Sequence, residues 1–271
     1  MIDAARKVYV VAHKEDTSKL EATLASEGFS VQVNRLSYTA QETKYSAAYR
    51  CLLNHMDVWA RVQSDGEPAI VVEADFVPVR GMARLPSPVP ACRLHHSIAW
   101  LYYGGGRLRG MDDEGYALGT APTMVAILCS PAGAGCMLRF GRQECVAEKV
   151  GKYSTWDVQL AVDVRAHGIT VYLPFKSYGE HGGLGNTEHE KHGVRTHHRA
   201  DVLWGRLAFL PAYAHGRLVT YWGTRLFYRC RGTLKLFAGR YIPFREMVGR
   251  PEYPAQLLAR MTAFALRRFF A

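Results

Sequence analysis

The sequence predicts an α/β protein in which a mostly parallel β-sheet lies between layers of helices, with a basic helical appendage at the C-terminal end. Short apolar runs typical of buried strands alternate with segments of helical periodicity through about residue 176. The chain has 271 residues, of which 48% are hydrophobic, enough to form the core of one large domain. We therefore expect an α/β domain over residues 1–200 and a basic, aromatic helical region over residues 201–271.

The chain opens with a predicted β-α-β unit. Residues 7–12 (KVYVVA) and 31–36 are predicted strands. The helix between them has N-cap candidates at Asp16, Thr17 and Ser18 and ends near Gly28. Two strands joined in this way predict a parallel pair with a right-handed crossover.

A long helix follows over about residues 45–63. Its apolar face is marked at helical spacing by Ala48, Cys51, Leu52, His55, Trp59 and Val62. Asp65-Gly66 ends the helix, and the apolar strand 69–72 then leads straight into Glu73-Ala74-Asp75. Prolines between residues 86 and 90 mark a loop, after which residues 97–103 predict another strand.

Residues 115–138 carry no charge and are long enough to span a bilayer. Pro122 and Pro131 instead favour a buried strand over 123–129 and a helix that begins at Pro131. A helix over 155–167 and a strand over 169–173 complete the alternation. Residues 178–198, rich in Gly and His, predict a loop, and helices are expected beyond Asp201.

The positive charge of the chain is concentrated near its C-terminal end. The net charge is +10, and residues 201–271 hold 12 Lys and Arg but only three acidic residues. This distribution indicates either a polyanionic partner or a solvated basic face. Arg alternates there with Trp, Tyr, Phe and Leu, which suits an amphipathic segment at a membrane surface; the alternative is a helical subdomain whose arginines extend along its surface.

Glu73 and Asp75 follow a predicted buried strand. Residues i and i+2 of an extended chain point the same way, so the two carboxylates can converge on one divalent ion. Ligands of open α/β sheets bind at the carboxyl ends of strands, where these residues are placed. Such an ion can also bind a diphosphate, as transfer from a nucleotide sugar requires.

Several segments resemble glycosyltransferase family 25, the lipopolysaccharide-type transferases. Residues 70–78 (IVVEADFVP) resemble its strand and DxD-like motif, and residues 50–59 (RCLLNHMDVW) resemble its ACxxSHxxxW helix, with Asn54 in place of Ser. Residues 115–138 resemble its next strand and helix, and Thr155-Trp156-Asp157 resembles its P-V-D helix start. The resemblance covers residues 6–176 and implies a GT-A (Rossmann-like) fold. Ala74 departs from it, because the family has an acid there; this leaves metal binding to Glu73 and Asp75.

The resemblance implies roles for three further groups of residues. Asp157, at a helix start, would be the general base of an inverting transfer, besides being a first-turn acid stabilised by the helix dipole. Ala12, His13 and Lys14 follow the first strand and would hold part of the nucleotide, the alternative being an ordinary exposed loop. His55 would lie at the site, the alternative being a buried core histidine.

The Gly- and His-rich loop offers further ligands. It contains His181, His189, His192, His197 and His198, without the spacing of a structural zinc site. GT-A enzymes often supply a further metal ligand after the last sheet strand, so His181 is the first candidate and His189 the second. The loop could also close over the donor, or be a plain surface loop.

We therefore predict a glycosyltransferase that moves a sugar from a nucleotide diphosphate, UDP by resemblance, onto a lipopolysaccharide- or capsule-type glycan, with Mn²⁺ or Mg²⁺ as cofactor. The absence of CxxC pairs among the six cysteines and of a signal peptide predicts a cytoplasmic protein. If the basic, aromatic tail contacts a membrane, the expected place is the inner face of the bacterial inner membrane, where a lipid-linked acceptor would be met. The alternatives are a nucleic-acid- or anionic-surface-binding protein, a zinc-binding scaffold and an inactive transferase-like protein.

Overall fold

An eight-stranded sheet lies at the centre of the computed structural model, which describes residues 2, 5–121, 123–146, 148–185, 190–193 and 198–270. Its strand order is β2-β1-β3-β8-β5-β9-β7-β6. The strands are β1 (Lys7–Val11), β2 (Ser30–Asn34), β3 (Ala69–Glu73), β5 (Ser97–Trp100), β6 (Arg107–Met111), β7 (Ala117–Thr120), β8 (Ala126–Cys129) and β9 (Thr170–Leu173). Only β8 and β7 run against the others, so the predicted mostly parallel α/β sheet is confirmed.

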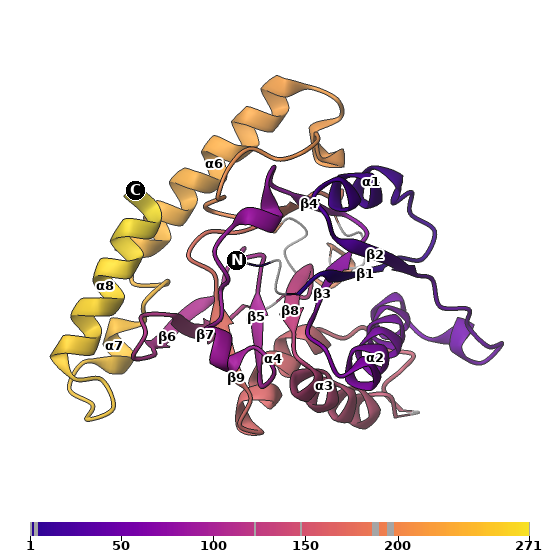
Figure 1. Cartoon of the computed structure of the whole chain (residues 1–271), viewed down its shortest axis with the longest axis horizontal. Coiled ribbons are helices and arrows are strands. Elements are labelled where there is room, and N and C mark those ends of the chain that lie inside the picture. Colours follow the sequence, from indigo (N-terminus) through magenta and orange to yellow (C-terminus); the bar gives the residue numbers. More distant parts are fainter. Residues whose placement is uncertain are drawn as a thin grey trace.

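Helices flank this sheet (Figure 1). They are α1 (Ser18–Ser26), α2 (Ala47–Asp65), α3 (Pro131–Glu144), α4 (Trp156–Ala166), α6 (Leu218–Phe237), α7 (Phe244–Met247) and α8 (Ala255–Phe270). In β1, Tyr9 and Val11 pack into the cluster that contains α2, α3 and α4, whereas Val8 and Val10 pack into the cluster that contains α1. This alternation follows the two-residue period of a strand and gives the protein a core on each face of the sheet.

Local sequence accounts for the positions of the main helices. Ser46 caps α2 by accepting from the amide of Tyr49, and Gly66 ends this helix with a left-handed φ of 71°. Ser130 accepts from the amide of Gly133 at 2.9 Å, which caps α3 directly before Pro131. A Cβ at Gly133 would lie 2.5 Å from Cγ1 of Ile98, so this glycine allows α3 to approach β5.

The sequence missed two pairs of strands. The hairpin β6–β7 extends the sheet, and β4 (Phe76–Pro78) pairs antiparallel with β10 (Gly179–His181). The loop predicted over 178–198 is therefore wrong at Gly179–His181. Three residues are too few for a periodic signal, and β10 forms because β4 supplies its hydrogen-bond partners.

The segment after residue 200 shares the core of the sheet. Tyr241, Met261 and Phe269 belong to the same buried cluster as Trp100, so residues on both sides of the boundary predicted after residue 200 contribute to it. Arg268 is fully buried, where it forms an ion pair with Asp201 and donates to backbone carbonyls that follow β9. Among the described residues, no helix combines the length and apolarity needed to cross a membrane.

Candidate functional site

A cavity of about 820 Å³ opens at the carboxyl ends of β1 and β3. Of the predicted site residues, those that line it are Ala12, His13, Glu73, Asp75, Asp157 and His181. Lys14 is exposed and does not line the cavity, and His55 is fully buried beside Glu73. The structure therefore brings together most of the residues that the sequence placed at a site.

Glu73, Asp75 and His181 lie together on the cavity wall. Each offers a ligand atom, and these atoms lie within 4.8 Å of one another. Nε2 of His181 lies 2.8 Å from Oδ2 of Asp75. The pairing of β10 with β4, in which His181 is opposite Phe76, brings the imidazole to the two carboxylates. Between the two carboxylates, the backbone amide of Ala74 donates to the carbonyl of Val11 at 2.9 Å, which ties this segment to the end of β1.

The chemistry of this cluster fits a divalent cation. Oδ1 of Asp75 and Nδ1 of His181 are buried and lack a hydrogen-bond partner among the described residues. Two carboxylates at this separation repel each other unless a positive charge lies between them. Burial lowers the pKa of His181, but the charge of Asp75 and its hydrogen bond outweigh burial and raise that pKa. A metal ion held by carboxylate oxygens and one imidazole would supply the positive charge instead.

A glycine makes room for the Asp75 carboxylate. A Cβ at Gly183 would lie 2.2 Å from Oδ2 of Asp75, closer than atoms can approach. The amide of the neighbouring Gly182 donates to the carbonyl of Asp75 at 2.8 Å. The Gly-rich sequence after His181 thus has a packing reason at this site, which the sequence alone could not distinguish from loop flexibility.

Arg199 fixes the backbone of the segment from His181 to Gly183. Its guanidinium donates to the carbonyls of His181 and Gly183, each at 2.7 Å, and lies 4.2 Å from the ring centre of Tyr213. The residue is 2% exposed. Sequence reasoning missed Arg199, because its only signal is a cation close to the His-rich segment.

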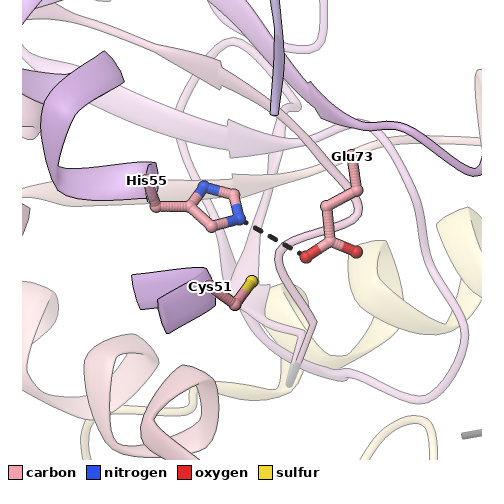
Figure 2. Close-up of side chains that lie close together, drawn as sticks. All are labelled: Cys51, His55 and Glu73. Atoms are coloured by element: carbon pink, nitrogen blue, oxygen red, sulfur yellow. Dashed lines mark hydrogen bonds and ion pairs between the residues drawn. The ribbon is translucent and has the colours of Figure 1, made fainter. Parts of the chain in front are cut away.

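Cys51, His55 and Glu73 form a second group, which shares Glu73 with the first (Figure 2). The two α2 side chains point toward the carboxylate, and Nε2 of His55 lies 3.4 Å from Oε1 of Glu73. Burial, and then the charge of Glu73, raise the pKa of the Cys51 thiol well above its usual value. The thiol therefore stays protonated in the metal-free protein, and the geometry supports His55 as a residue that orients Glu73.

Asp157 lies in the first turn of α4 on the cavity wall. Burial raises the pKa of its carboxyl to about 7, the charge of Glu73 adds to this shift, and the amide of Val158 opposes it by donating at 3.0 Å. A carboxyl group with this pKa can accept and release a proton near neutral pH, which suits a general base.

Asn34 and Asn54 fix the end of β1. Nδ2 of Asn34 donates to Oδ1 of Asn54 at 2.7 Å, and Nδ2 of Asn54 donates to the carbonyl of Ala12 at 2.8 Å. Both asparagines are buried. Asn54 thus has a buried hydrogen-bond partner in Asn34, which the sequence did not reveal.

The segments that follow β1 and β2 each present a ring to the cavity, His13 and Tyr38. The ring centres of His13 and Tyr38 lie 5.6 Å apart, and Arg35 donates to the carbonyl of His13 at 3.0 Å. Among the remaining histidines, His192 and His198 line the cavity, and His192 stacks on Tyr153 at 4.2 Å. The predicted candidates His189 and His197 lie outside the described residues.

The fold and this cavity define an α/β protein with a candidate metal cluster at the carboxyl edge of its sheet. No model of a known protein family matches the chain, and no curated protein shows significant similarity to it.

Proposed function

We propose that the protein is a metal-dependent glycosyltransferase that uses a nucleoside diphosphate sugar. The observation that carries this proposal is the convergence of Glu73, Asp75 and His181 in one cavity with Asp157. The cluster suits a divalent ion, and Asp157 suits a base whose pKa lies near 7. The ordered resemblance to glycosyltransferase family 25 over residues 6–176 names the same carboxylates.

Different residues of the cavity would bind the metal ion and the nucleotide base. Glu73, Asp75 and His181 would hold Mn²⁺ or Mg²⁺, which when bound neutralises the charge of a diphosphate leaving group. His13 and Tyr38 present rings on which a nucleotide base can stack. UDP is the nucleotide that the family resemblance favours.

Asp157 acts on the acceptor. Its carboxylate takes the proton from an acceptor hydroxyl as the oxygen of that hydroxyl bonds to the anomeric carbon of the donor sugar. The bond from that carbon to the diphosphate oxygen breaks, and the nucleoside diphosphate leaves with the electron pair. A base acting on the incoming oxygen favours inversion at the anomeric carbon. A lipopolysaccharide- or capsule-type glycan is the acceptor that the resemblance favours.

Calorimetric titration with UDP, with and without Mn²⁺, tests the proposal. We expect binding that requires the metal and that Asp75→Asn and His181→Gln abolish. Asp113→Asn is the matched control, because Asp113 is exposed in the β6–β7 hairpin and does not line the cavity. Failure of UDP and of other nucleotides to bind with any divalent ion would overturn the proposal. If UDP binds, slow hydrolysis of a panel of UDP-sugars identifies the donor.

A further inference from the structure

One face of α6 is apolar and open to water along the whole helix. Its side chains recur at helical spacing, and the α6 face is defined here as Val219, Trp222, Leu226, Phe227, Leu234 and Phe237. These side chains are 54% to 86% exposed, whereas Tyr221 and Tyr228 on the opposite side are buried. A contiguous apolar stripe of this kind marks an interaction surface rather than scattered surface residues.

The end of α8 extends the α6 face. The rings of Phe237 and Phe270 lie 6.4 Å apart, and Phe270 is exposed. Figure 1 shows α6 and α8 along one flank of the molecule, on the side opposite to α2. The stripe therefore lies on an outer surface, where a large flat partner can reach it.

The charge around the α6 face is mostly positive, and the one acidic side chain of the adjacent hollow, Asp201, is paired with Arg268. No Asp or Glu occurs between residues 202 and 245, and Arg217 and Arg240 are exposed at the two ends of the helix. Beside Trp222 and Leu226, Lys176 and Arg206 line a hollow of about 420 Å³. The surface thus offers an apolar stripe together with cations suited to phosphate groups.

We propose that the α6 face docks on the surface of a membrane rich in anionic phospholipid. The apolar side chains would enter the boundary between headgroups and acyl chains, while the flanking cations contact lipid phosphates. This assignment is independent of the chemistry proposed for the cavity.

Charge and side-chain type favour a bilayer, rather than a second copy of the chain or nucleic acid, as the partner of the α6 face. A second copy of the chain would bring two basic surfaces together, which like-charge repulsion opposes. Nucleic acid would meet the cations, but Val219, Leu226 and Leu234 cannot stack on bases as aromatic rings do. An anionic bilayer matches both the apolar stripe and the positive charge.

Flotation of the full-length protein with vesicles tests the proposal. We expect binding to vesicles that contain phosphatidylglycerol, weakened by salt, and little binding to phosphatidylcholine alone. The variant Leu226→Glu/Phe227→Glu should bind at least about tenfold more weakly, because two apolar side chains no longer enter the bilayer. Val158→Glu/Val162→Glu is the matched control, since these valines are exposed on α4, outside the α6 face.

Two further readouts locate the contact. Trp222 fluorescence should shift to the blue on vesicle binding, and Trp222→Phe should remove that shift. Arg206→Gln/Arg217→Gln should weaken binding to anionic vesicles while the protein stays folded, as both residues are exposed. No binding to anionic vesicles, or equal binding by the Leu226→Glu/Phe227→Glu variant, overturns the proposal. A dimer that this variant disrupts, or nucleic-acid binding in place of vesicle binding, also overturns it.

Discussion

Nε2 of His181 lies 2.8 Å from Oδ2 of Asp75, although the two residues come from distant segments of the chain. They meet because β10 pairs with β4, the short strand that begins directly after Asp75. A Cβ at Gly183 would overlap the position that Oδ2 of Asp75 occupies in this arrangement. The geometry of the candidate metal cluster therefore depends on a glycine that is not itself a ligand.

Gly183→Ala should weaken Mn²⁺ binding at least about tenfold, because the new methyl group must displace the carboxylate of Asp75. Gly151→Ala is the control, since Gly151 lines the same cavity but a Cβ there would meet no atom within 4 Å. Calorimetric titration with Mn²⁺ measures both variants. Equal Mn²⁺ affinity of the Gly183→Ala variant and the wild type would show that Gly183 does not fix the position of the Asp75 carboxylate.

Asp157→Asn should become more stable relative to the wild type as the pH rises. The folded-state pKa of about 7 lies above the usual value of about 3.9, so the folded protein holds a proton that the unfolded chain loses between these values. The wild type therefore loses stability as pH increases through this window, by about 1–2 kcal/mol between pH 5 and pH 8. Urea unfolding of both metal-free proteins at these two pH values measures the difference.

The same variant should lose at least about 100-fold in the rate of sugar transfer while it still binds UDP and metal. The two measurements are independent, because the first concerns burial of the carboxyl group and the second its role as a base. A stability difference that does not change with pH would contradict burial. An unchanged rate of transfer would remove Asp157 as the base.

Asn34→Ala and Asn54→Ala should each lower the free energy of unfolding by about 1–3 kcal/mol, because each removes the bond between the two buried side chains, which leaves Oδ1 of Asn54 or Nδ2 of Asn34 without that partner. The double variant should lose less than the sum of the two, with a coupling energy of about 1 kcal/mol. Urea unfolding of the three variants completes the cycle. Additive losses would show that the bond between Nδ2 of Asn34 and Oδ1 of Asn54 contributes nothing.

Arg268→Met should lower the free energy of unfolding by about 3–5 kcal/mol, because it leaves the Asp201 carboxylate without its buried partner. Adding Asp201→Asn to this variant should restore part of the loss by removing the unpaired charge. Arg267→Met is the control, since Arg267 is the exposed neighbour on the same helix. Equal unfolding midpoints of the Arg268→Met and Arg267→Met variants would contradict a structural role for the ion pair.

The sequence predicted those elements whose signals are local. The apolar run of β1, the apolar face of α2 and the Ser130-Pro131 start of α3 each lie within a few residues of chain. The β6–β7 hairpin was missed because its glycines suppress strand propensity. At Gly119 the structure explains the glycine, because a Cβ there would lie 2.2 Å from the carbonyl oxygen of Arg107.

The candidate site was predictable only in part. Glu73 and Asp75 could be found because they follow a buried strand, and the role of each remains a prediction. His181 was chosen among the loop histidines by its position after the last strand, whereas Lys14, chosen by its position after the first strand, is exposed and does not line the cavity. Asn34 and Arg199 could not be found, because their partners are set by tertiary contacts.

The burial of Arg268 and Phe269 has a consequence for synthesis of the protein in the cell. Their partners include Pro174, Phe175 and Tyr241, and β9, the last strand of the central sheet along the chain, ends at Leu173. A ribosome that adds about 5–20 residues per second needs roughly 5–20 s to travel from the end of β9 to the end of α8. During this interval the nascent sheet exposes apolar surface, so we expect it to depend on chaperones until α8 has emerged.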